Sequence, residues 1–366
     1  MRVLHLVKTS SGARFALLQM RELVNLGIDV HVALPAGGPL VLRYGQYGIK
    51  VHFLQTNFPL RNPWRFPQMA GDLRALVADI QPDLIHSHFV GTTLTLRLAL
   101  GKKNPIPRIF QVPGPLHLEH RFFRHAELAT AGEPDYWIGG CQWTTECYRR
   151  SGVDPTRVFL GYYGKDWQVF ANPTKGKLRQ ELGLRDDIKI VGMVAYMYPP
   201  KRYLGQKRGI KGHEDLIDAI ALCSQHRNDI IGVFVGGAWN KAYSYEKQIR
   251  EYAERKGGDR FVFLGTRNDV LELYPDFDVA VHPSHSENLG GAVESLLLKV
   301  PTIATNVGGF PDIVIDGETG WLVPPGRPDK LAEKILVTLD DRETAQRMAT
   351  CGQKRAMTLG NARSNA

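Results

Sequence analysis

Short apolar runs alternate with amphipathic segments along most of the chain. The run 2–7 precedes apolar residues at three-and-four spacing over 14–27, which predicts a strand and then a helix. Further strand-like runs in the first half lie at 29–35, 83–89 and 108–113. This strand–helix alternation indicates a parallel sheet with helices on both faces.

The alternation restarts after residue 187. Strands are predicted at 188–194, 230–237, 261–265, 279–284 and 301–305, and helices at 213–226, 245–257, 269–276 and 291–298. The polar segment 164–187 is expected to be a linker with a short helix. We therefore predict an α/β protein with two Rossmann-like, doubly wound parallel-sheet domains.

The length of 366 residues suits two domains of ordinary size. We expect a first domain over 1–168, a second over 169–350, and a short or truncated C-terminal tail over 351–366. Ligands of open α/β sheets bind beyond the carboxyl ends of the strands, so two facing sheets would share one interdomain cleft.

The composition, 43 % hydrophobic and 23 % charged, is that of a soluble globular protein. The four cysteines form no C-x-x-C pair, which favours free thiols in a reducing compartment. We find neither a signal peptide nor an apolar run near the roughly 18–20 residues that cross a bilayer. The expected location is cytoplasmic.

A net charge of +9 admits nucleic acid, an anionic membrane or phosphate-bearing substrates as partners. No nucleic-acid-binding motif is visible, so we expect no nucleic-acid partner. The segment 59–80 interleaves Arg61, Trp64, Arg65 and Phe66 ahead of an amphipathic stretch. Two interpretations stay open: a peripheral contact with the acidic inner face of a membrane, or a solvated loop before a surface helix.

The loop 282–305 carries the clearest chemistry. Glu287 and Glu294 bracket Gly290 and Gly291, directly before a predicted helix that Pro301 ends. Glycines at such a position let backbone N–H groups approach an anion, usually a phosphate. A carboxylate beside that anion can accept hydrogen bonds from sugar hydroxyls.

Several motifs, in this order, resemble glycosyltransferase family 4: "PDLIHSHF", "KGHEDLIDAI", "FLGTRNDVLELY", "DVAVHPSHSEN", "VPTIATNVGGFPDIV" and "GETGWLVPPG". The resemblance spans about residues 3 to 350 and is strongest in the second half. It implies a retaining transferase of the two-Rossmann-domain (GT-B) architecture. The first domain would bind the acceptor and the second the nucleotide-sugar.

The resemblance also implies roles for single residues. Glu294 would hold the ribose hydroxyls and Glu287 would face the donor sugar, although one position fewer separates them than in the family pattern. Leu289, Gly290 and Gly291 would offer backbone N–H groups to the donor. Lys211 would neutralise the diphosphate.

In the first half, Gly12 would approach the reaction centre and His88 would line the acceptor side. The family histidine after strand 108–112 is Pro113 here, and His117 is a candidate substitute. His86 and His88 alternate along a strand end, so we expect them on opposite faces.

The family arginine after strand 188–194 is Tyr196 here. The longer loop 198–210 carries several cations, and we expect Arg202 or Arg208 to replace that arginine over the diphosphate. Arg267 and Asn268 are candidates for contacts with the nucleotide base.

The predicted function is metal-independent transfer of a sugar from a nucleotide-diphosphate sugar to a saccharide or lipid-linked acceptor, in cell-surface polysaccharide or glycan synthesis. No cofactor is expected, and a metal role for Asp276 and Asp278 is considered remote. Two alternatives stay open: a nucleotide-sugar-binding protein without transferase activity, and a nucleotide-sugar 2-epimerase of the same architecture.

Overall fold

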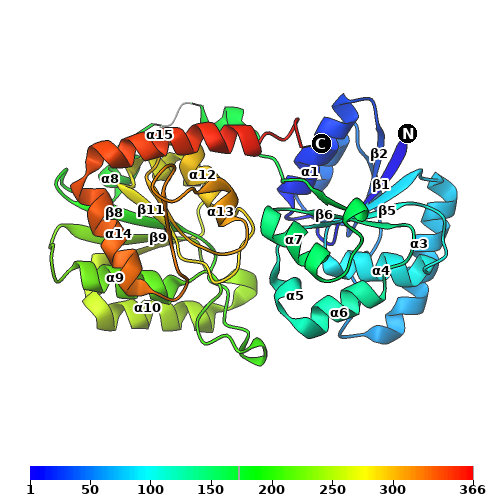
Figure 1. The fold of residues 1–366 in the computed structure, drawn as a ribbon, viewed down its shortest axis with the longest axis horizontal. Helices are drawn as coiled ribbons and strands as arrows, with labels where there is room; N and C mark the ends of the chain where they lie inside the picture. Colours follow the sequence, from blue (N-terminus) through cyan, green and yellow to red (C-terminus); the bar gives the residue numbers. More distant parts are fainter. Residues whose placement is uncertain (172–173, 366) are drawn as a thin grey trace. The chain divides into compact units, whose positions relative to one another are not determined.

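A computed structural model describes residues 1–171 and 174–365 and shows two compact units (Figure 1). The N-terminal unit comprises Met1–Asp166 together with the chain from Gly360 onward, and the C-terminal unit comprises Trp167–Leu359. Both are parallel α/β sheets, so the predicted pair of doubly wound Rossmann-like domains is confirmed. Each unit is described separately below.

The N-terminal unit is built on a seven-stranded parallel sheet of order β3-β2-β1-β4-β5-β6-β7. Its strands are β1 (Arg2–Leu6), β2 (Asp29–Leu34), β3 (Lys50–Phe53), β4 (Leu84–Ser87), β5 (Arg108–Val112), β6 (Asp135–Gly139) and β7 (Val158–Leu160). Its helices are α1 (Arg14–Asn25), α2 (Val41–Gln46), α3 (Phe66–Ile80), α4 (Val90–Leu100), α5 (Leu116–Glu119), α6 (Arg121–Ala129) and α7 (Gln142–Arg150).

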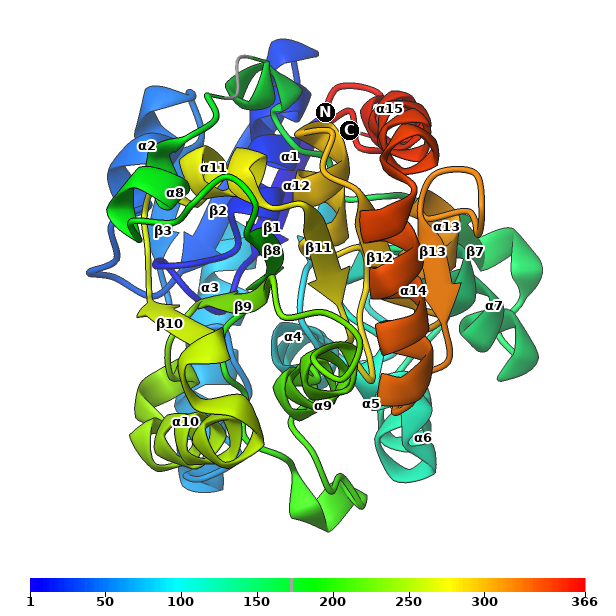
Figure 2. The ribbon, with the colours of Figure 1, turned by 90° about the vertical axis from the view of Figure 1, so that its left-hand side faces the viewer.

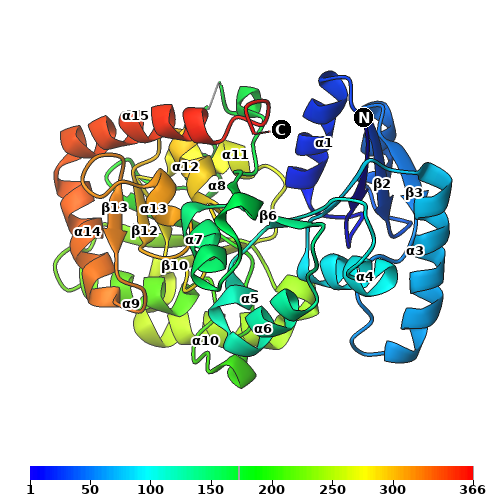
Figure 3. The same cartoon turned by 45° about the vertical axis from the view of Figure 1, so that its right-hand side comes forward.

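Helices cover both faces of this sheet because its strands are apolar on both sides. Leu4 and Leu6 pack with Leu73 of α3 and Leu96 of α4 in one buried cluster. A second cluster packs residues of β2 against α1 and α2, through Val30, Val32, Leu17, Met20 and Tyr44. Figure 3 shows α1 and α3 on opposite sides of the strands.

The C-terminal unit has a six-stranded parallel sheet of order β10-β9-β8-β11-β12-β13. Its strands are β8 (Lys189–Val194), β9 (Ile230–Val235), β10 (Phe261–Gly265), β11 (Val279–His282), β12 (Thr302–Thr305) and β13 (Trp321–Val323). Its helices are α8 (Lys177–Glu181), α9 (His213–Cys223), α10 (Tyr243–Gly257), α11 (Val270–Leu273), α12 (Ala292–Leu297), α13 (Phe310–Ile313), α14 (Pro328–Asp340) and α15 (Arg342–Leu359).

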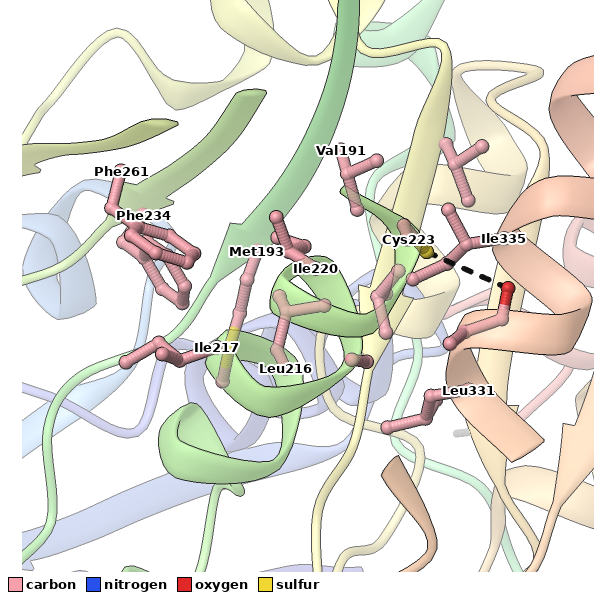
Figure 4. Close-up of a cluster of buried hydrophobic side chains, with 14 of the residues drawn as sticks. Val191, Met193, Leu216, Ile217, Ile220, Cys223, Phe234, Phe261, Leu331 and Ile335 are labelled. Atoms are coloured by element: carbon pink, nitrogen blue, oxygen red, sulfur yellow. Dashed lines mark hydrogen bonds between the residues drawn. The ribbon is translucent and has the colours of Figure 1, made fainter. Parts of the chain in front are cut away.

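The largest buried cluster of this unit surrounds α9. Leu216 and Ile220 of α9 pack under Val191 and Met193 of β8, while α14 lies alongside α9 (Figures 2 and 4). The Cys223 thiol donates a hydrogen bond of 3.6 Å to the Ala332 carbonyl, which joins the two helices (Figure 4). This core fixes the loops at the carboxyl ends of β8 and β11.

The C-terminal end differs from the expected tail over 351–366. Helix α15 continues through residue 359 because Met348, Ala349 and Gly352 are buried, and a Cβ at Gly352 would lie 2.4 Å from Leu296. Beyond it, the Gly360 carbonyl accepts a hydrogen bond of 2.7 Å from the Lys165 amide. The last described residues therefore belong to the N-terminal unit.

Candidate functional site

A cavity of about 160 Å³ lies in the C-terminal unit, where β8 and β11 end. Its walls come from the end of β8, the loop before α9 and the loop between β11 and α12. The lining residues are Met193, Val194, Ala195, Tyr196, Tyr198, Lys211, His282, Ser284, Glu287, Gly291 and Phe310. This is the position at which parallel α/β sheets bind ligands.

Lys211 and Glu287 meet inside this cavity as an ion pair. Both side chains are largely buried, at 22 % and 14 % exposure. Lys211 precedes α9, whose first residue follows Gly212. A cation ahead of a helix N-terminus is unfavourable to the helix dipole. The ion pair with Glu287 offsets that cost, and a bound anion would do the same.

Two glycines hold the Glu287 loop in place. Gly308 has φ +52°, and a Cβ there would lie 1.8 Å from the Glu287 carbonyl oxygen. Gly212 has φ +73°, and a Cβ there would lie 2.0 Å from the Pro283 carbonyl oxygen. Only glycine tolerates both the left-handed conformation and the close backbone approach at these positions.

Leu289, Gly290 and Gly291 connect Glu287 to α12. Leu289 is buried at 5 % exposure, and Gly290 has φ +45°. Gly291 precedes the first residue of α12 and lines the cavity. The loop therefore places the backbone of these glycines beside Glu287.

Glu294 lies in the first turn of α12. Burial, and then the charge of Glu294, hold the pKa of the Tyr274 hydroxyl well above its usual value. That hydroxyl has no hydrogen-bond partner among the described residues, and it would lie 3.4 Å from a Cβ at Gly291. Glu294 and the Tyr274 hydroxyl thus lie in one polar environment at the start of α12.

His282 contributes no charge to the cavity. Burial and then the nearby Lys211 lower the pKa of His282 to about 3, so its ring is neutral at pH 7. Its Nε2 lies 3.0 Å from the Ser295 hydroxyl. Lys211 and Glu287 are therefore the two charged groups that line this cavity at neutral pH.

Of the two arginines expected over the diphosphate, Arg208 already has two carboxylate partners. Its guanidinium lies 2.5 Å from Asp215 and 2.8 Å from Asp218, both on α9. Arg202 is exposed in a short turn of the loop 198–210, and none of the ion pairs within 1–171 and 174–365 involves it. The structure leaves Arg202 as the more available cation.

Arg267 and Asn268 follow β10. The Arg267 guanidinium binds Asp269 at 2.7 Å and Glu181 of α8 at 2.6 Å. Asn268 is exposed. Arg267 is therefore committed to a network of surface charges and does not line the cavity.

Asp276 and Asp278 have structural partners. Asp276 accepts hydrogen bonds from the backbone of Gly176 and Leu178, both at 2.7 Å. Asp278 pairs with Arg179 at 2.8 Å. These contacts fasten α8 to the sheet.

In the N-terminal unit, His5, His86 and His88 form one buried cluster. The expectation that His86 and His88 point to opposite faces is wrong: their rings stack with centroids 4.2 Å apart. The reason is that β4 ends at Ser87, so the alternation of a strand no longer governs His88. His88 also lies 3.2 Å from the Tyr163 hydroxyl.

The cluster has three nitrogen ligands within 4.8 Å of one another. His5 Nδ1 and His88 Nε2 already share a hydrogen bond of 2.9 Å. Burial lowers the pKa of His86 to about 3, so its ring is neutral at pH 7. The Nε2 atoms of His5 and His86 are buried without a hydrogen-bond partner among the described residues.

The other two N-terminal candidates, Gly12 and His117, lie apart from this cluster in the chain. Gly12 has no positive φ, and a Cβ there would meet only the Thr9 methyl at 3.8 Å. His117 lies on α5 with its Nε2 3.3 Å from the Tyr148 hydroxyl. Burial lowers its pKa to about 4.

The geometry places a charged pair, glycine-rich loops and a cavity at the carboxyl end of a Rossmann-like sheet, in a chain with two such sheets. This defines a GT-B architecture. The pattern of the family described as "Glycosyl transferases group 1" matches residues 175–355, and that of "Glycosyltransferase Family 4" matches residues 12–166. The chain belongs to the group 1 and family 4 glycosyltransferases.

Curated relatives match over part of their length. A D-inositol 3-phosphate glycosyltransferase of Mycobacteroides abscessus is 30 % identical over 187 residues, which cover 50 % of this chain and 39 % of the relative. The lipopolysaccharide core biosynthesis mannosyltransferase LpsB of Rhizobium meliloti is 27 % identical, with 51 % and 52 % covered. The chain spans about half the length of the curated relatives it matches, or less.

Solved structures share the fold. Anabaena HepE in complex with UDP-glucose matches with a TM-score of 0.80 and 23 % identity, covering 100 % of this chain and 96 % of that one. Sucrose-phosphate synthase from Thermosynechococcus elongatus has a TM-score of 0.81, 21 % identity, and coverage of 100 % and 96 %. At these identities the similarity shows the GT-B fold alone.

Proposed function

We propose that this protein transfers a sugar from a nucleotide-diphosphate sugar to a saccharide or lipid-linked acceptor, with retention of configuration. The observation that carries the proposal is the Lys211–Glu287 pair in the cavity at the carboxyl end of β8 and β11. Family membership supports the reaction class, and the UDP-glucose complex of HepE supports the donor class.

In this mechanism the bond between the sugar and the diphosphate breaks while negative charge grows on the leaving group. Lys211 exchanges its Glu287 partner for the diphosphate, because a growing dianion attracts the ammonium more strongly than one carboxylate does. Glu287 is then free to accept hydrogen bonds from sugar hydroxyls. Glu294 is assigned to the ribose hydroxyls.

Retention would follow if the acceptor attacks from the side of the leaving group and a phosphate oxygen takes its proton. No protein base is then required. Lys211 and Arg202 are the cations we assign to the diphosphate, and this assignment makes the proposed transfer independent of metal. Addition of a chelator should then leave turnover unchanged.

The acceptor is assigned to the N-terminal unit. A hollow of about 810 Å³ lies between the loop after β3 and the start of α3, and Arg61, Arg65, Phe58 and Asp72 help to line it. Trp64, 72 % exposed, lies beside it in the chain. The two cations and the exposed indole support a lipid-linked acceptor at an anionic membrane surface, which we assign to polysaccharide or glycan synthesis. Among the described residues, no helix is long and apolar enough to span a membrane.

Incubation with UDP- and GDP-sugars tests the proposal. Release of a nucleoside diphosphate with sugar transfer to an acceptor supports it. Formation of an epimer would instead indicate a 2-epimerase, and binding without any turnover would indicate a nucleotide-sugar-binding protein.

A further inference from the structure

One wall of the cavity is aromatic at the position where the sequence has Tyr196 in place of an arginine. Met197 is fully buried in the core of the C-terminal unit. It forms an isolated parallel bridge with Ala238, and its amide donates to the Gly237 carbonyl at 2.9 Å. Neighbours of a residue in extended backbone point to the opposite side. Tyr196 and Tyr198 therefore both face the cavity, which they line.

Trp239 does not line the cavity itself but packs against the two tyrosines that do. Its amide donates to the Met197 carbonyl at 3.1 Å, which holds the Trp239 backbone beside the segment that carries the two tyrosines. The Trp239 ring stacks on Tyr198, with centroids 4.9 Å apart and planes 26° apart, and meets Tyr196 edge-on at 5.4 Å. Trp239 and Tyr196 nevertheless stay 46 % and 41 % exposed. The pair presents uncovered aromatic surface that the protein core does not use.

The backbone around the wall is unusually constrained. A Cβ at Gly236 would lie 2.1 Å from the Ala195 carbonyl oxygen, so only glycine lets the two chain segments approach. Asn240 and Lys241 then adopt positive φ angles of 50° and 63°. Non-glycine residues in this region are strained and concentrate at functional sites. The constraint fixes where Trp239 lies.

The wall borders the charged pair directly. The Lys211 ammonium lies 5.8 Å from the centre of the Tyr198 ring, and Lys211 pairs with Glu287. Burial, and then the charge of Glu287, raises the pKa of Tyr198 to about 12, so its hydroxyl stays protonated at pH 7. One cavity thus combines a carboxylate, hydroxyl groups and flat aromatic faces.

We propose that Tyr196 and Trp239 form a stacking platform for the donor sugar, a pyranose with an unsubstituted apolar face. A pyranose has hydroxyl groups at its rim and C–H groups on its faces. The rim requires acceptors and donors, which Glu287 and Ser284 supply, and the face packs on an aromatic ring. This inference rests on the proposed function.

A nucleobase is the other flat ligand of a nucleotide-sugar that an aromatic surface can stack. The polar groups of the cavity favour the sugar over the base. Glu287 and Ser284 can bind sugar hydroxyl groups, and Lys211 lies in the same cavity, where it can bind the phosphate. Tyr196 and Trp239 are therefore specificity residues for the sugar.

Calorimetric titration of UDP and UDP-glucose, with GDP and GDP-mannose in parallel, tests this role. The measured quantity is the ratio of affinities for the sugar nucleotide and for the free nucleotide. We expect Tyr196→Ala and Trp239→Ala to lower this ratio about threefold to tenfold, the usual range for an aromatic contact, with free-nucleotide affinity unchanged. Tyr196→Phe should keep the ratio of the wild type.

Tyr243→Ala is the matched control, because Tyr243 is 68 % exposed, does not line the cavity and, among the described residues, has no ring contact with Tyr196 or Tyr198. An unchanged ratio in both wall variants would overturn the inference, as would an equal loss for free and sugar-bearing nucleotide. Failure of every nucleotide-sugar to bind the wild type would contradict the proposed function itself, which is a separate result.

Discussion

Lys211 and Glu287 form an ion pair across 76 positions of sequence. Each belongs to a different loop, and each loop depends on a glycine that approaches neighbouring backbone. In the absence of a donor, the cavity therefore carries a balanced pair of charges. Under the proposed function, a donor diphosphate would displace Glu287 from Lys211 and so couple donor binding to release of a carboxylate.

The two glutamates should respond differently to substitution. Glu294→Gln should weaken binding of free UDP, because an amide offers one acceptor oxygen where a carboxylate offers two. Glu287→Gln should change turnover or sugar choice more than the affinity for UDP. Titration with UDP decides between these outcomes, and equal impairment of both variants would contradict the assigned roles.

Substitutions of the two arginines in the loop 198–210 should also differ in their effects on melting temperature and turnover. Arg208 is held by Asp215 and Asp218, so Arg208→Ala removes a cation shared by two carboxylates, of which Asp218 keeps Lys256 as a cation at 2.8 Å, and should lower the melting temperature. Arg202→Ala should reduce turnover with no change in melting temperature, because Arg202 is exposed.

The loop itself is expected to order over the diphosphate. Shortening 198–210 to a tight turn should abolish transfer. Loss of turnover in Arg208→Ala at an unchanged melting temperature, with full activity in Arg202→Ala, would reverse the assignment of the two arginines.

Gly308→Ala should disrupt the Glu287 loop. A methyl group at this position would have to adopt φ +52° and would lie 1.8 Å from a backbone oxygen. The left-handed conformation alone costs about 1–2 kcal/mol, and the clash adds to it. Gly183→Ala is the control, since Gly183 has φ +61° with no atom within 4 Å. Urea unfolding should show a clearly larger loss for Gly308→Ala, and equal losses would refute the close approach.

Stability should fall as the pH drops below about 6.5. Burial lowers the pKa of His86 and His282 to about 3, and that of His117 and His213 to about 4. Below the ordinary histidine pKa, the unfolded chain binds protons that the folded chain excludes. Each such histidine then removes up to about 1.4 kcal/mol per pH unit, until the pH reaches its folded pKa.

Urea unfolding at pH 7.5, 6.0 and 5.0 measures this slope. The variant His86→Gln should lower the slope because it removes one titrating group. A free energy of unfolding that stays constant between pH 7.5 and 5.0 would contradict the neutral, buried state of these rings.

The sequence predicted the sheet architecture because continuous apolar runs that alternate with helices indicate strands of a parallel sheet covered on both faces. It missed β3, β6, β7 and β13, since these strands of three to five residues carry too little pattern. It also missed the stacking of His86 and His88, because strand alternation ends one residue earlier than the motif does.

The candidate site was predictable where chemistry is local. Glu287, Gly290 and Gly291 share one loop, and Lys211 opens a helix where a cation is unfavourable without an anion. The aromatic wall was not predictable, because Trp239 meets Tyr196 and Tyr198 only through the bridge between Met197 and Ala238. The partners of Arg208 likewise depend on how the loop packs against α9.

The rate of nucleoside diphosphate release by Lys211→Ala tests the central claim most directly. We expect kcat to fall about 10²–10³-fold relative to the wild type at saturating donor, by analogy with the loss of one charge-stabilising donor. Lys207→Ala, in the adjacent exposed loop, is the matched control and should fall far less. Unchanged turnover in Lys211→Ala, with the fold intact, would remove Lys211 from the site and contradict this account.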